Sequence, residues 1–229
     1  MSLSPGISRA VFHPWPVCWG GRVSAMRSGR VEAFSDGVFA IAITLLVLDL
    51  GVPSLEESRH EGLWTALGHE WPSYVAYLVS FFVIGIIWIN HHTMLTLVDR
   101  VDRLVLFANL VLLLFVSVIP FPTRLLADYL LEPEGHIAAA IYSATMLAMG
   151  IAFSALWLTI SGRPGILRRP LDAATRRATL RRFGAGQVIY AAAVALSFVS
   201  AVATLALHGL LALYYCFDQL TPSGGPDDG

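Results

Sequence analysis

The sequence predicts an all-α integral membrane protein with six transmembrane helices per chain. Hydrophobic residues make up 56% of its 229 residues and charged residues only 14%, whereas about a quarter of a soluble domain is charged. The mean hydropathy is +0.66. The apolar residues also gather in long runs, and about 20 of them suffice to cross a bilayer as a helix. This composition excludes a soluble globular protein, a nucleic-acid binder and a disordered chain.

Four apolar runs each have the length of one span, and they cover residues 33–50, 72–90, 104–126 and 137–160. Another run, 183–217, would form a helix of about 50 Å, which is too long for one span. We therefore divide this run into spans 183–199 and 201–217, with a tight turn near Ser197–Ala201. A single very oblique helix, which gives five spans in total, is the alternative.

The six spans define one domain, which we place at residues 26–220. Residues 1–25 contain three prolines and three glycines, which interrupt any helix. We expect this segment to be a disordered extension or a start assigned too early. Residues 221–229 are expected to be a disordered tail.

The basic residues predict the orientation in the membrane. All fifteen are arginines, and thirteen of them lie before the first span, after the second and after the fourth. Because basic loops stay on the inner side, the N-terminus is expected in the cytoplasm. Six spans return the C-terminus to the same side. A chain rich in Arg and Ala and lacking Lys is typical of a GC-rich bacterium, so we expect a bacterial plasma membrane.

The first span contains polar residues, and placing them in lipid costs free energy. Ser35 and Asp36 are adjacent within its first turns. Ionisable groups at such a depth usually face protein or water and mark function. The alternative is that Asp36 only starts the helix near the headgroups, where the helix dipole favours an acid.

When successive residues of this span are placed about 100° apart around a helix axis, they fall into three faces. Asp36 points nearly opposite to an aliphatic stripe. A neighbouring stripe of small residues permits close approach of another helix, and an aliphatic stripe on an arbitrary helix usually faces lipid. The aliphatic stripe contains Phe34, Ile41, Leu45 and Leu48 with Thr44 at its edge, and the small stripe contains Ala33, Gly37, Ala40 and Thr44.

The motif of this span resembles that of a known channel family. Arg30 is followed by Phe34, Ser35, Asp36 and the apolar run 37–50. This arrangement resembles the endosomal and lysosomal potassium channel family called transmembrane protein 175. The resemblance covers about residues 26–218 and extends to polar residues of later spans and loops, namely Trp88, Asn90, His91, His92, Asp99, Asp102, Asn109 and Pro120.

The resemblance implies a potassium-permeable cation channel. Bacterial members of that family have six spans per chain and form homotetramers, in which the first helix lines a central pore. A Thr-Val-Gly-Tyr-Gly selectivity loop is absent from this sequence, so modest selectivity over sodium is expected. The resemblance assigns the hydrophobic constriction to Ile41, Leu45 and Leu48, with Thr44 for selectivity. The aliphatic stripe would then face the pore, where hydrophobic rings gate by dewetting.

The resemblance further implies a polar network that does not touch the ion and holds the first span at its angle. The expected members lie at the cytoplasmic ends of the first two spans, and the sequence leaves open which histidine contacts the first span. They are Arg30, Phe34, Ser35, Asp36, Trp88, Asn90, His91 and His92.

Two other functions remain as alternatives. A secondary cation transporter usually has internal repeats and broken helices, and we find neither here. A metal-dependent membrane enzyme could use His91 and His92, but neighbouring helical residues point about 100° apart, whereas zinc ligands converge at i, i+3 or i+4. We therefore expect no enzyme activity, cofactor or tightly bound metal. The expected partners are the lipid bilayer, the permeating potassium near Ile41 and Thr44, and identical subunits.

Overall fold

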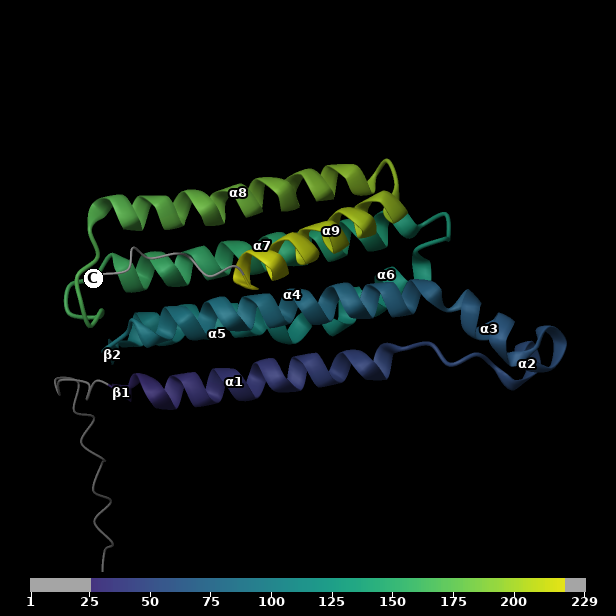
Figure 1. The fold of residues 1–229 in the computed structure, drawn as a ribbon, viewed down its shortest axis with the longest axis horizontal. Helices are drawn as coiled ribbons and strands as arrows, with labels where there is room; N and C mark the ends of the chain where they lie inside the picture. Colours follow the sequence, from purple (N-terminus) through teal and green to yellow (C-terminus); the bar gives the residue numbers. More distant parts are fainter. Residues whose placement is uncertain (1–25, 221–229) are drawn as a thin grey trace, which may run out of the picture.

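The structure is a computed structural model, and it describes residues 26–220. It is a bundle of long helices that lie roughly side by side, with two short strands at one end (Figure 1). The chain is a helical membrane protein, because four described segments are long and apolar enough to cross a bilayer. These segments are Ser28–Asp49, Trp71–Thr96, Arg103–Tyr129 and Gly135–Ser161.

The first span changes its helix type before it ends. Helix α1 covers Ser28–Leu45, and a 3-10 helix, η1, continues it over Leu46–Asp49. The sequence predicted one regular helix over 33–50. The tighter turn brings residues three apart onto one line, which matters for the exposed face described below.

Two short helices follow at the far end of the bundle. Helix α2 covers Leu55–Glu61 and helix α3 covers Leu63–His69, and both project beyond the long helices (Figure 1). The Ser54 hydroxyl accepts from the Glu57 backbone N–H, and the Glu57 carboxylate accepts from the Ser54 N–H. This capping box fixes the start of α2.

The next two spans differ in regularity. Helix α4 is continuous over Trp71–Thr96. The run predicted at 104–126 is instead two helices, α5 over Arg103–Val118 and α6 over Pro120–Tyr129. The division comes at a proline because Pro120 cannot donate a backbone hydrogen bond inside a helix, whereas it fits the first position of a new one.

The described residues after α6 form three further helices. Helix α7 covers Gly135–Ser161, α8 covers Ala173–Ser197 and α9 covers Ala201–Leu220. The apolar run 183–217 is interrupted at residues 198–200. Helix α8 begins ten residues before that run, and these additional first turns contain arginines. Those arginines keep α8 outside the four clearly apolar segments.

The connections at the arginine-rich end are held together by backbone hydrogen bonds. Strand β1 (Met26–Arg27) pairs antiparallel with β2 (Arg100–Val101). The Asp99 N–H donates to the Ile166 carbonyl over 2.8 Å, and the Arg168 N–H donates to the Leu97 carbonyl over 2.9 Å. The start of α1, the α4–α5 connection and the α7–α8 loop therefore form one layer at this end.

Candidate functional site

Helix α1 has one buried face, which packs on the rest of the chain. Its neighbours are α4 and α5. The buried residues recur at helical spacing, and the polar Ser35 is among them at 0% exposure. They are Val31, Ser35, Phe39, Ala42 and Leu46.

The opposite face of α1 is apolar, and no other part of residues 26–220 covers it. The exposed fractions are 60% for Ile41, 42% for Leu45 and 71% for Leu48. Ile41 and Leu45 are four residues apart in the α-helix, and Leu45 and Leu48 are three apart where the 3-10 helix begins. Both spacings align side chains in their own helix type. The three residues predicted as a constriction therefore share one line.

Thr44 lies beside this line and is also exposed. Its hydroxyl donates to the carbonyls of Ala40 and Ile41, over 3.0 and 2.9 Å. Because the only hydroxyl hydrogen is used inside the helix, the side chain offers oxygen lone pairs to the surroundings. The stripe of small residues is exposed as well, so no described helix of the same chain packs against it.

Trp88 joins the arginine-rich end of α1 to α4 through a side-chain hydrogen bond. The indole Nε1–H of Trp88 donates to Oδ1 of Asp36 over 2.8 Å. A charge-assisted bond of this kind is stronger than a neutral one. The structure therefore brings together two of the residues predicted for the polar network.

A second connection runs through three buried side chains. His91 Nε2 lies 2.8 Å from Asn109 Oδ1, the Asn109 amide donates to Ser35 Oγ over 2.9 Å, and Ser35 donates to the Val31 carbonyl. The chain of donors is consistent if His91 carries its proton on Nε2. We call His91, Asn109 and Ser35 the buried triad. It joins α4, α5 and α1.

Sequence reasoning did not include Asn109 among the network residues. Its side chain is 2% exposed, and it forms hydrogen bonds with both other members of the triad. The available signal was a lone amide in an otherwise apolar helix, since a buried polar group needs hydrogen-bond partners. That signal alone did not show which helices Asn109 joins.

The remaining predicted network residues are placed differently. His92 Nδ1 lies 3.0 Å from a Glu32 carboxylate oxygen, so both histidines reach α1, one directly and one through Asn109. The Asn90 amide donates to the Ile86 carbonyl on its own helix. Arg30 and Phe34 are exposed, and the described part of the chain gives neither a contact with the network.

The other end of this span is joined to α6 by charges. Arg124 lies 3.8 Å from Asp49 and 3.5 Å from Asp128. Asp49 is the last residue of η1. Since the pairs are partly exposed, each stabilises only weakly. These charges, the Trp88 bond, the His92–Glu32 contact and the triad all lie near the ends of the span. Among the described residues, no side-chain hydrogen bond joins the middle of α1 to another helix.

The structure gives no support for a metal centre among residues 26–220. It contains no described group of three or more His, Cys, Asp or Glu side chains that could hold a metal ion. The His91 ring is buried against Phe39 at 5.4 Å between centroids, whereas His92 is exposed and faces Glu32. The two adjacent rings therefore diverge, as their spacing predicts.

Asp102 stabilises the layer at the arginine-rich end. Its carboxylate accepts the Val105 N–H over 2.9 Å as the N-cap of α5 and forms an ion pair with Arg163. Partial burial raises the pKa of this carboxyl, but the Val105 and Arg163 bonds together outweigh that effect and lower it below 3.8. The carboxylate form is therefore the one that the fold stabilises.

We expect Asp102→Ala to lower the free energy of unfolding by about 1–2 kcal/mol at pH 7, because a cap and a partly screened ion pair are lost. A lowered pKa means that this stability is present above pH 3.8 and is lost as the pH falls through the lowered value. Thermal unfolding in detergent at pH 7 and pH 3 measures the difference, with Asp99→Ala as the exposed control. An equal effect at both pH values would contradict this assignment.

Comparison with known proteins identifies the family. Residues 30–120 match the family described as "Endosomal/lysosomal potassium channel TMEM175". A potassium channel of Streptomyces collinus is 56% identical over 195 residues, which cover 84% of this chain and 93% of that protein. The chain belongs to the TMEM175 family.

Other TMEM175 relatives agree over most of the chain. A potassium channel of Chamaesiphon minutus is 42% identical over 188 residues, covering 82% of this chain and 93% of that protein. The crystal structure of a lysosomal potassium-selective channel TMEM175 homolog from Chamaesiphon minutus superposes with a TM-score of 0.77 at 40% identity. That match covers 85% of this chain and 98% of the other. The helical arrangement is thus the TMEM175 fold.

Proposed function

We propose that this protein is a potassium-permeable cation channel whose pore is lined by α1. The observation that carries the proposal is the division of α1 into two faces. One face is buried and tied to α4, α5 and α6, and the other is apolar, continuous and uncovered at Ile41, Leu45 and Leu48. The names of the Streptomyces and Chamaesiphon relatives support potassium as the permeant ion.

The proposal requires several copies of the chain. A single α1 cannot enclose a path, whereas a closed ring of identical subunits can. We propose a homotetramer of six-span subunits, with α8 and α9 as the fifth and sixth spans. The exposed stripe of small residues on α1 fits close packing between neighbouring copies of this helix.

The proposed constriction consists of aliphatic rings. In a tetramer, Ile41, Leu45 and Leu48 each supply four side chains, and such rings exclude water when the radius is small. A cation must lose water to pass, and potassium loses it more easily than sodium. Selectivity over sodium is therefore modest, and the Thr44 oxygens are the polar atoms beside the rings.

The arginines set the proposed orientation. All described arginines except Arg59 and Arg124 lie at the end of the bundle that holds β1 and β2, or in the first turns of α8 (Figure 1). By the positive-inside rule this end is cytoplasmic. We place the channel in a bacterial plasma membrane with both termini inside, and the Trp88 bond and the triad near the inner end of the pore.

Flux through purified protein in liposomes tests this function. We expect passive potassium flux that grows linearly with the gradient, because a channel conducts without a transport cycle. Thr44→Ala should lower the potassium preference over sodium severalfold, since it removes the oxygen beside the rings, while total flux stays within about threefold. Reversal potentials under paired potassium and sodium gradients measure the preference. Thr145→Ala on α7 is the control, because Thr145 is also exposed and also bonds its own helix.

Two outcomes would contradict the proposal. Slow flux that saturates with the ion concentration would favour the secondary transporter. An unchanged preference in Thr44→Ala, or the same change in Thr145→Ala, would remove Thr44 from the pore.

A further inference from the structure

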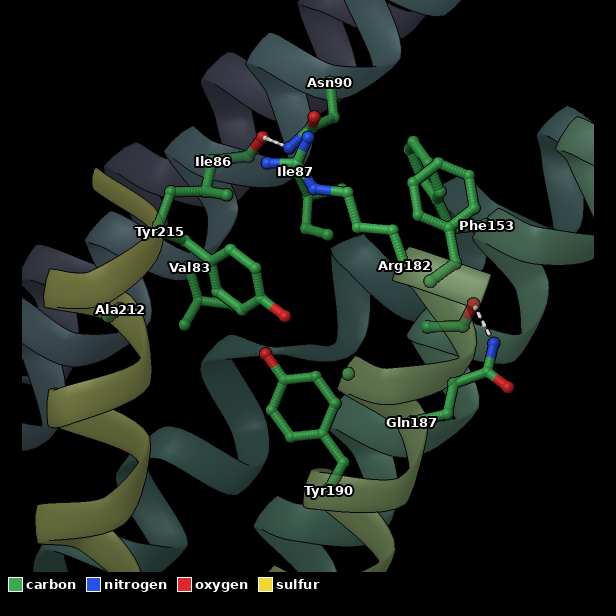
Figure 2. Close-up of a pocket in the computed structure, with 13 residues that line it drawn as sticks. Val83, Ile86, Ile87, Asn90, Phe153, Arg182, Gln187, Tyr190, Ala212 and Tyr215 are labelled. Atoms are coloured by element: carbon green, nitrogen blue, oxygen red, sulfur yellow. Dashed lines mark hydrogen bonds between the residues drawn. The ribbon is translucent and has the colours of Figure 1, made fainter. Parts of the chain in front are cut away.

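A pocket separates α8 from α4, α7 and α9, away from the exposed face of α1. Figure 2 shows side chains from all four helices around it. Its volume is about 100 Å³. Most of the wall is apolar, and Gly150 and Gly186 widen it because they carry no side chain. The apolar members include Val83, Ile86, Ile87, Phe153, Phe183 and Ala212.

The lining also contains polar side chains, namely Asn90, Arg182, Gln187, Tyr190 and Tyr215. Tyr190 and Tyr215 both line the pocket and direct their hydroxyls toward each other across it (Figure 2). Arg182 and Asn90 line the same pocket. An apolar cavity with a few converging polar groups is the usual form of a ligand site.

The charge of the pocket selects the ligand. Arg182 is the only charged residue in the described lining, which contains no carboxylate. Arg176, Arg177 and Arg181 precede Arg182 on α8 and do not line the pocket. Guanidinium groups bind phosphate through two parallel hydrogen bonds, and basic pockets between helices on the inner side of a membrane bind anionic lipid headgroups.

We propose that this pocket binds an anionic phospholipid of the inner leaflet. Arg182, with Asn90 and the two tyrosine hydroxyls, binds the headgroup phosphate. The apolar wall receives the first part of an acyl chain, since its volume of about 100 Å³ is too small for a whole lipid. The rest of the lipid lies along the outside of α8.

The position of the pocket connects it to the proposed pore. Asn90 lies on α4 two residues after Trp88, which bonds to Asp36 on α1. A lipid between α8 and α4 therefore stabilises the segment that holds the inner end of α1. This consequence rests on the proposed channel function, whereas lipid binding itself does not.

Native mass spectrometry of the purified protein tests the binding directly. We expect phosphatidylglycerol to be retained more strongly than phosphatidylcholine of the same acyl chains. Arg182→Gln should weaken this retention about tenfold, the effect of losing a charged hydrogen bond, and the Tyr190→Phe/Tyr215→Phe double variant should weaken it severalfold. Arg177→Gln is the control, because Arg177 lies five residues earlier, about 140° around the helix, and does not line the pocket.

The proposal would be overturned if both lipids were retained equally, or if Arg182→Gln retained phosphatidylglycerol fully. Equal losses of phosphatidylglycerol in Arg182→Gln and Arg177→Gln would also overturn it. So would complete displacement of the lipid by inorganic phosphate, which would indicate a site for a free anion. Potassium flux in liposomes with and without phosphatidylglycerol then separates the two proposals. Specific binding without any flux would support the lipid site and contradict the channel.

Discussion

Ile41→Asn is expected to increase potassium flux about tenfold or more. Ile41 lies in the middle of the uncovered face of α1 and is 60% exposed in the single chain. In a tetramer the substitution replaces four aliphatic side chains of one ring with amides. An amide can replace part of the hydration of an ion, and lowering the barrier by about 1.4 kcal/mol raises the rate tenfold. The substitution also prevents dewetting of the ring.

Single-channel or liposome flux recordings measure this effect, with Ile151→Asn as the matched control. Ile151 lies on α7, is 52% exposed and receives the same change in side chain. We expect its flux to equal that of the unchanged protein. If both variants raised flux equally, a general disturbance of the bundle would explain the result and α1 would not line the pore.

Asn109→Leu is expected to destabilise the protein by about 1–3 kcal/mol and to reduce conduction. The substitution keeps a similar volume but leaves His91 and Ser35 buried without their Asn109 partner, and an unsatisfied buried group costs this amount. The side-chain hydrogen bonds and ion pairs that remain between the arginine-rich end of α1 and α4 are those of Asp36 and Glu32, which are more exposed. Thermal unfolding measures the stability, and potassium flux measures the effect on the pore.

A double-mutant cycle separates the triad from general packing. Ser35→Ala and Asn109→Leu remove the same hydrogen bond. The double variant should therefore lose less stability than the sum of the losses of the two single variants. Ser80→Ala is the matched control, because Ser80 is equally buried and bonds instead to Thr123 and Tyr142. Additive effects for the Ser35 pair would show that the triad does not act as one unit.

The elements of this fold could be predicted largely from the local sequence. Long apolar runs and prolines mark most helix ends, and Pro120 explains why one run becomes α5 and α6. The change to a 3-10 helix at Leu46 could not be predicted, because its residues are ordinary helix formers and the contacts of Asp49 with α6 are made across the bundle. The length of α8 was underestimated because its first turns contain arginines, so hydropathy alone did not include them in the helix.

The contacts around the arginine-rich end of α1 could be predicted only in part from the sequence. Asp36 and Trp88 were both expected in one network, and the structure joins them. Whether His91 or His92 reaches α1 depends on the rotation of α4, which tertiary packing sets. Asn109 was missed for the same reason, since its partners lie 18 and 74 residues away in the sequence.

The 3-10 segment Leu46–Asp49 gives α1 a way to change length and pitch locally. A 3-10 helix rises about 2.0 Å per residue and turns about 120°, compared with about 1.5 Å and 100° in an α-helix. Rewinding four residues as α-helix shortens the segment by about 2 Å and unwinds it by about 80°. The Leu48 side chain then rotates around the helix axis, while the hydrogen bonds of Asp36 and Ser35 stay in place. In the proposed tetramer, the ring formed by Leu48 would therefore widen without any tilting of whole helices.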